Sequence, residues 1–290
     1  DVKYFLQIIV ILAINTALLP SKRVIETSKR KYFFSFYPQT FDERNSDSRY
    51  GSLVRDNDRY LVTMVADGMH QQISPLEYYR LAKHIPDSKM VVIDRYLRMC
   101  HLGTGIWCLL KFYRLLFDER KTEYQFGGID LTMYVRQEIV WSASRVSRLL
   151  VMLGSLNIAL GKIGIKELVY ITFEYPFGRM ISYVVGKYWP DILRTGFNHG
   201  DYSWRFVNYF LAPGEARVEP PYIDHCPVPD RVLAEDSLCA EIYEYNGYKS
   251  IELMTKVYRL QYLEGIQVEK KKNLAEKDRE KLRKLILQVA

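Results

Sequence analysis

The chain has 290 residues, of which 48% are hydrophobic and 26% charged, so it can bury a substantial core and is not a disordered polymer. Its formal net charge of +7 favours an anionic partner, such as nucleic acid, phospholipid head groups or a phosphorylated substrate. The four cysteines have neither the paired spacing of a zinc site nor the density of a disulfide scaffold, which indicates free thiols in a reducing compartment.

Residues 1–30 are predicted to form a hydrophobic helix with a basic flank. Residues 4–19 are apolar but fewer than the roughly 20 that a membrane span needs, and several lysines and arginines follow them. Two interpretations stay open: a helix at a membrane surface, and a helix packed on its own domain or the stump of a longer span. We therefore expect a cytoplasmic protein, either free or in peripheral contact with the inner membrane at its cytoplasmic face.

The first strand is predicted at residues 31–37, and a polar loop leads from it to the expected start of a helix at residues 48–53. In an α/β domain, the loop after the first strand and the amino end of the next helix are places where an anion or a sugar hydroxyl binds. Ser48, Arg49 and Tyr50 are therefore candidate substrate-binding residues. The alternative for Ser48 is that it only caps the helix.

Further strands are predicted at residues 59–66 and 90–94, with a helix between them that starts at the capping sequence Ser74-Pro75. Residues 97–116 are expected to form one apolar helix or a pair of helices, and residues 129–161 the longest helix. The glycines of this region do not have the spacing of a phosphate-binding loop.

The stretch 168–204 most resembles a working site. Residues 168–173 and 192–197 are predicted strands with a helix between them. If they are parallel neighbours joined by the usual right-handed crossover, their carboxyl ends share one sheet edge. Glu174 and His199, which follow these strands, would then face one crevice at the edge where open α/β sheets bind ligands.

A carboxylate and an imidazole in one crevice can orient each other and move a proton at neutral pH. We therefore treat Glu174 and His199 as candidate catalytic residues. The alternative is that Glu174 caps the following helix, where a negative charge suits the helix dipole, and that His199 is a turn residue.

The last part of the chain contains a long proline-rich loop at residues 209–229, and such loops are usually functional. Strands are expected at residues 231–234 and 249–255, with a helix between them. The alternation predicts an α/β fold with a doubly wound, mostly parallel, Rossmann-like sheet over residues 31–264. Residues 265–290 are expected to be a charged linker and the first strand of a second domain.

Several short motifs resemble the amino-terminal half of a GT-B glycosyltransferase of bacterial surface-carbohydrate (capsule or O-antigen) biosynthesis. They are FSFYP with the downstream SRYGSL, FEYPFGR, GFNHG, LAPGEA, PDRVLAED, NGY and VYRLQYL, and they cover roughly residues 31–263. The resemblance implies two Rossmann-like domains facing across a cleft. It also implies an acceptor-side amino-terminal domain, and a nucleotide-sugar donor held mainly by the carboxyl-terminal one.

The resemblance also implies roles for individual residues. Similar enzymes have a His-Gly in the cleft, which corresponds to His199 and Gly200, and often an acidic residue at the position of Glu174. The sequence has Arg179 near the place where a second acidic residue is expected, which puts a two-carboxylate mechanism in doubt.

On this model His199 or Glu174 would position or deprotonate an acceptor hydroxyl. Arg179 and Arg205 would stabilise the leaving phosphate, with Asp201 as a further substrate-binding residue. We expect no metal and no cofactor beyond the nucleotide-sugar co-substrate, since no DxD-type acidic site is evident.

The product would be a sugar transferred to a surface-polysaccharide or lipid-linked acceptor. Two alternatives stay open. One is a polyol-phosphate transferase of the same architecture, and the other is a non-catalytic carbohydrate-binding or nucleic-acid-binding module. The sequence has no RNA-recognition signature, helix-turn-helix pattern or zinc finger, so we expect no nucleic-acid partner.

Overall fold

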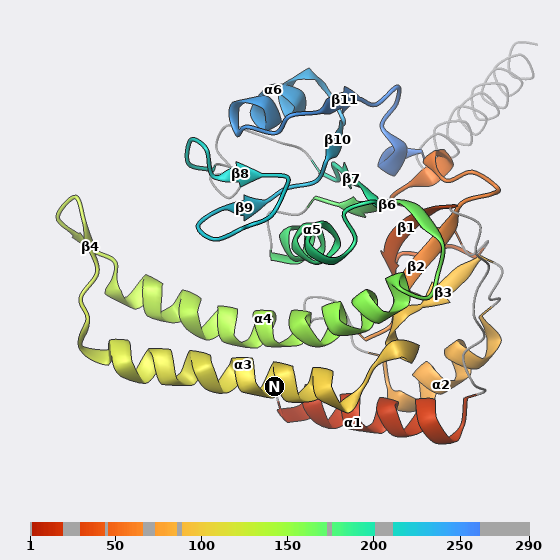
Figure 1. Ribbon diagram of the computed structural model, residues 1–290, viewed down its shortest axis with the longest axis horizontal. Coiled ribbons are helices and arrows are strands. Elements are labelled where there is room, and N and C mark those ends of the chain that lie inside the picture. Colours follow the sequence, from red (N-terminus) through yellow and green to blue (C-terminus); the bar gives the residue numbers. More distant parts are fainter. Residues whose placement is uncertain are drawn as a thin grey trace, which may run out of the picture.

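The computed structural model describes residues 2–19, 30–43, 46–65, 73–85, 89–172, 176–200 and 211–261. At its centre is a seven-stranded sheet in which all neighbouring strands are parallel (Figure 1). Its strands are β1 (Arg30–Phe36), β2 (Arg59–Thr63), β3 (Met90–Val92), β6 (Ile165–Ile171), β7 (Leu193–Phe197), β10 (Arg231–Ala234) and β11 (Ile251–Leu253).

The strand order across this sheet is β11-β10-β7-β6-β1-β2-β3. From β1 the chain adds β2 and then β3 on one side. It then returns to the middle of the sheet and adds β6, β7, β10 and β11 on the other side of β1. This is the order of Rossmann-like sheets, with a further strand at one edge. The predicted α/β fold with a parallel, Rossmann-like sheet is confirmed. The order reverses between β1 and β6, and in such sheets a crevice opens at the carboxyl ends of these strands.

Helices cover both faces of the sheet. Alternate residues of one strand therefore lie in two different cores. Phe33 of β1 lies in a core with helix α1, while Tyr32 and Phe34 lie in a second core with α4 and α5. The helices are α1 (Val2–Ala17), α2 (Pro75–His84), α3 (Met99–Asp118), α4 (Thr132–Leu160), α5 (Pro176–Tyr188) and α6 (Ser237–Tyr245). The sheet is thus doubly wound, as the alternation of elements predicts.

Helix α1 is packed on its own domain, as one of the two interpretations of this segment expects. Tyr4, Ile8 and Ile11 are buried in the same core as Phe33. The other side of α1 remains exposed, including Val2 at 75%. The charged linker and extra strand expected at residues 265–290 lie outside the described residues.

The sequence predicts helix starts at residues 48–53 and at Ser74, and the structure has an α-helix only after the second. Residues 48–53 do not start an α-helix: the chain makes a single 3-10 turn at Gly51–Leu53, and no side chain caps it. Ser48 is therefore not a helix cap. The cap at Ser74 is confirmed, because its Oγ accepts a hydrogen bond from the Glu77 N–H at 3.2 Å.

Helices α3 and α4 form a long hairpin that extends well past the sheet (Figure 1). The second half of α4 packs on the sheet, whereas Thr132 is the one buried residue before Ala143. At about 1.5 Å per residue, the 29 residues of α4 outreach the seven of β6 by roughly 20 Å. Since α4 runs antiparallel to β6, its first half extends beyond the carboxyl ends of the strands.

The tip of this hairpin carries short elements: the 3-10 turn Glu119–Lys121 and the antiparallel pair β4 (Gln125–Phe126) and β5 (Ile129–Asp130). By length and composition alone α4 could cross a membrane, but 44% of its most apolar stretch is buried within the domain. A core helix of this kind passes the same test.

Candidate functional site

The carboxyl ends of β6 and β7 lie side by side. The two strands pair in parallel and end level with each other, with Ile171 opposite Phe197. Beyond this pair, the Thr172 N–H donates to the Phe197 carbonyl at 3.0 Å. The predicted arrangement of two adjacent parallel strands is confirmed, so the segments that follow them leave the sheet at one edge.

The turn after β7 is held in place by a buried asparagine that the sequence analysis did not single out. The side chain of Asn198 donates to the Gly200 carbonyl and accepts from the Glu235 N–H, both at 3.2 Å. Its own N–H donates to the Leu233 carbonyl of β10 at 3.0 Å. His199 therefore sits in a short turn fixed at both sides. The sequence pattern that identifies Asn198 is a polar residue directly after a buried strand.

Gly200 completes this turn with a backbone φ of +144°, a conformation that favours glycine. A Cβ added there would meet nothing within 4 Å, so the backbone angle and not crowding calls for a glycine. His199 is partly exposed. His199 thus lies at the carboxyl edge, where the single strand β6 separates β7 from the reversal point between β1 and β6.

Three other predicted site residues, Glu174, Asp201 and Arg205, lie outside the described residues. The end of β6 at Ile171 and the start of α5 at Pro176 bracket the position of Glu174 in the chain. The pairing of Glu174 with His199 stays a prediction.

Arg179 lies in the early part of α5 and is partly buried. Its positive charge affects the pKa of two neighbouring side chains. Burial raises the pKa of the Cys226 thiol and of the Tyr248 phenol, and in both cases the positive charge of Arg179 opposes that rise. The Arg179 charge therefore lies near Cys226 in β9 (Cys226–Pro227) and near Tyr248.

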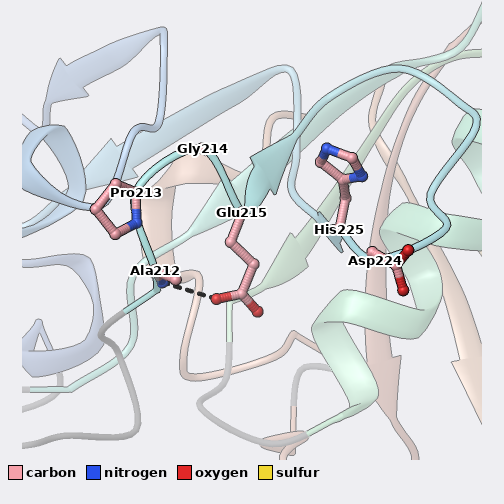
Figure 2. A pocket seen from close by; sticks show the side chains of 6 residues that line it. All are labelled: Ala212, Pro213, Gly214, Glu215, Asp224 and His225. Carbon is pink, nitrogen blue, oxygen red and sulfur yellow. Dashed lines mark hydrogen bonds between the residues drawn. The ribbon is translucent and has the colours of Figure 1, made fainter.

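An open recess of about 680 Å³ lies beside this strand (Figure 2). One side is the turn from Ala212 to Glu215, and the other is formed by Asp224 and His225. The Glu215 carboxylate accepts a hydrogen bond from the Ala212 N–H at 2.7 Å. The recess belongs to the long loop that the sequence predicts to be functional.

The charge of Arg179 and the charge of Glu215, which lines the recess, both act on the buried thiol of Cys226. The negative charge of Glu215 acts on the pKa of Cys226 in the same direction as burial and against Arg179. The β8 strand (Ala216–Arg217) that follows Glu215 pairs with β9, with Ala216 opposite Cys226. Strand β9 also contacts α5, so the loop that forms the recess lies beside the helix that carries Arg179.

Of the three candidate residues after β1, Arg49 is buried and its guanidinium binds other side chains of the domain. Its Nη2 lies 2.6 Å from the Asp47 carboxylate, and it also donates to the hydroxyls of Ser35 and Thr40. Ser35 in turn donates to Asp47. This closed cluster holds the loop against the end of β1 and neutralises the arginine.

Tyr50 is likewise fully buried, and its hydroxyl donates to the Phe34 carbonyl at 2.6 Å. Ser48 is exposed, and its hydroxyl donates to the Thr40 carbonyl at 3.3 Å. Ser48 is thus the candidate of the three that lies at the surface. Binding of substrate by any of them stays a prediction, and Arg49 and Tyr50 support the loop in this structure.

A further carboxylate at the carboxyl edge, Asp94, was expected only as the end of a strand. It is buried after β3, where it accepts hydrogen bonds from the Thr63 hydroxyl at 3.0 Å and the Met64 N–H at 2.6 Å. Burial raises the pKa of Asp94 to about 6, although these hydrogen bonds oppose the rise. Its partners lie on another strand, so no local pattern marks it.

Within the described ranges, no group of three or more His, Cys, Asp or Glu side chains could hold a metal ion. The chemistry available at the edge is therefore that of an imidazole in a fixed turn, a cationic side chain on the adjacent helix and an open recess beside it. No protein-family model, curated protein or solved structure matches the chain.

Proposed function

We propose that this chain is the acceptor-side domain of a GT-B-type glycosyltransferase. In this proposal it moves a sugar from a nucleotide-sugar donor to a surface-polysaccharide or lipid-linked acceptor. The observation that carries the proposal is the His199-Gly200 turn at the carboxyl end of β7, which Asn198 ties to β10. A Rossmann-like sheet alone hosts many functions, so the proposal depends on this turn and on the motif resemblance.

In the proposed reaction the acceptor hydroxyl gives its proton to the His199 imidazole as its oxygen attacks the anomeric carbon of the donor sugar. The bond from that carbon to the phosphate oxygen breaks, and the nucleotide leaves with the electron pair. Glu174 orients the imidazole or shares the proton, as carboxylates beside a histidine base do. Preorganised positive charge is the main way in which proteins stabilise such a leaving group.

Arg179 and the amino end of α5 supply positive charge on the described side of the proposed cleft. Gly200, Asp201 and Arg205 would contact the sugar or the phosphates from the turn after β7. We assign no metal or cofactor to this domain. The four thiols are free, which suits the reducing cytoplasm where we place the protein.

The first test is a thermal-shift panel of CMP-, UDP-, GDP- and CDP-linked sugars on a protein that includes the proposed second domain. Stabilisation by one nucleotide class supports the transferase, because a ligand that binds the folded state raises its melting temperature. A shift with CDP-linked polyols but not with sugars would favour the polyol-phosphate transferase.

The same panel can reject both enzymes. Absence of any shift in a well-folded sample, together with steeply salt-dependent binding of random oligonucleotides, would instead indicate a nucleic-acid-binding module. Binding of glycans with no response to any nucleotide would indicate a carbohydrate-binding module.

A further inference from the structure

The outer face of α3 exposes a row of large apolar side chains. Trp107 is 61% exposed and Phe117 is 62% exposed. Five of its members, Met99, Ile106, Leu110, Tyr113 and Phe117, lie three, four or seven residues apart and share one face of the helix, with Trp107 beside them. Leu102 and Gly105 are the buried residues of α3, and they pack on the domain. The exposed apolar residues of α3 are Met99, Ile106, Trp107, Leu110, Tyr113, Leu115 and Phe117.

Helix α1 continues this apolar surface. It lies along α3 (Figure 1). Gly105 allows α4 and α1 to approach α3 closely, since a Cβ there would lie 2.6 Å from Val151 of α4 and 3.2 Å from the Phe5 ring of α1. The side of α1 that faces away from the core is mainly apolar, with Lys3 near one end and Thr16 near the other. Its exposed large residues are Val2, Leu6, Ile9 and Val10, with Leu18 just after the helix.

The tip of the hairpin adds aromatic and aliphatic side chains at the far end of the same structure. They are Phe126, Ile129, Met133 and Tyr134, and all are exposed. We call these side chains, together with the exposed rows of α1 and α3, the apolar face. Large exposed apolar patches mark interaction sites in most soluble proteins.

The charges on α1 and α3 have mainly one sign. Asp118 is the one acidic residue in these two helices, against Lys3, Lys111 and Arg114. The Lys111 ammonium lies 5.6 Å from the centre of the Trp107 ring. Aromatic rings beside lysine or arginine are typical of segments that lie in a membrane interface, where the ring enters the head-group region and the cation stays in water.

We propose that the apolar face binds the surface of a lipid bilayer that contains anionic phospholipid. The helices would lie in the plane of the interface with their outer rows in the lipid, and the basic residues would contact the head groups. A second copy of the chain fits less well. A symmetric dimer would place this face against itself and would bury the charges of Lys3 and Lys111 between two apolar surfaces.

The placement also bears on the candidate site. The hairpin extends past the carboxyl ends of the strands, so the part of the apolar face at its tip lies toward the same end of the domain as the His199 turn. If the proposed function is right, this is where a lipid-linked acceptor would be presented. The binding of lipid itself does not depend on the proposed function.

The test is sedimentation of the protein with vesicles of phosphatidylcholine alone or of phosphatidylcholine and phosphatidylglycerol at three to one. We expect binding to the anionic vesicles that weakens with salt. The double variant Trp107→Glu, Leu110→Glu should lower the partition coefficient by about tenfold or more, since it removes two large apolar side chains from the lipid. The matched control is Leu76→Glu, Tyr245→Glu, which changes two exposed residues of α2 and α6 and should bind like the wild type.

The replaced side chains are exposed, so the melting temperature reports that each variant is folded. Three outcomes overturn the proposal: no vesicle binding by the wild type, equal binding by the double variant, or a wild-type dimer that the double variant converts to a monomer with vesicle binding unchanged. The nucleotide-sugar panel repeated on the double variant separates the two proposals. It should give the wild-type shift even where lipid binding is lost.

Discussion

The two ends of the parallel sheet use polar side chains in opposite ways. Near the amino ends, Glu167 accepts from Lys31 at 3.2 Å, from Arg231 at 2.8 Å and from Thr195 at 2.8 Å. Arg231 also lies 3.2 Å from Glu252, so this network joins β1, β6, β7, β10 and β11 side by side. Its charges are balanced by one another, which suits a role in holding the strands in register.

At the carboxyl ends, the Arg49–Asp47 pair after β1 is also balanced in charge, but the polar side chains after β3 and β7 bond mainly to the backbone. Asn198 uses both ends of its amide on main-chain groups, and Asp94 accepts from the Met64 N–H. These residues fix turns and do not neutralise each other. The comparison teaches that one edge is built for stability and the other for positioning, which agrees with the location of ligand sites in open α/β sheets.

The largest expected effect is that of His199→Ala on sugar transfer. Loss of a general base lowers the rate by about 100-fold to 10,000-fold, while the partly exposed position leaves the melting temperature nearly unchanged. The measurement is the initial rate of transfer by the intact enzyme. His84→Ala, an exposed histidine at the end of α2, is the control and should keep the rate. An unchanged rate in His199→Ala would remove the imidazole from the mechanism.

Asn198→Ala should affect both rate and stability, because the Gly200 carbonyl loses a donor and the Glu235 N–H loses an acceptor, although the main-chain bond to Leu233 remains. We expect about 1–3 kcal/mol less unfolding free energy by urea titration and a transfer rate at least about tenfold lower. Asn198→Asp, which keeps an oxygen for the Glu235 N–H, should recover part of the stability. A variant that loses stability and keeps the rate would limit Asn198 to a structural role.

Glu167→Gln should lower stability by about 1–3 kcal/mol without changing transfer, since it removes the charge shared by Lys31 and Arg231. Burial raises the pKa of Glu167, but hydrogen bonds and these cations outweigh it and leave the pKa below its ordinary value of 4.5. The stabilisation is thus present above that value and lost as the pH falls through the lowered pKa. Urea titrations of both proteins should converge in acid, and a gap independent of pH would refute this account.

Asp94→Asn should give the smallest change, visible as a shift with pH. The folded state favours the protonated carboxyl, because burial raises its pKa from 3.8 to about 6. The stability that Asp94 contributes is complete below the lower value and is lost as the pH rises through the upper one. The melting temperature of the variant minus that of the wild type should therefore increase across this window. A constant difference would show that the carboxyl is not buried as described.

Much of the fold could be predicted from local patterns. The runs at residues 31–37 and 192–197 are rich in strand-forming or apolar residues, and each lies within one or two residues of an observed strand. The serine-proline start of α2 is a local signal and was found. The adjacency of β6 and β7 was a premise suggested by the strand-helix-strand order, and the observed pairing of the two strands confirms it.

What could not be predicted depends on contacts distant in the sequence. Residues 48–53 look helical, but Arg49 is drawn to Ser35 in β1, so the chain makes only a short turn there. Asp94 is buried by partners on β2, about thirty residues earlier. Apolar periodicity shows that α3 has an apolar face but not whether protein or solvent covers it, so the exposure of Trp107 appears only in the structure.

The network around Glu167 has a consequence for the order of events during synthesis. Lys31 emerges early from the ribosome, whereas Arg231 and Glu252 are made about 200 residues later. Until β10 and β11 arrive, Glu167 has only Lys31 and Thr195 as partners, and the exposed edge of β7 has no neighbour. We therefore expect the nascent domain to stay susceptible to proteases until its last two strands have been translated.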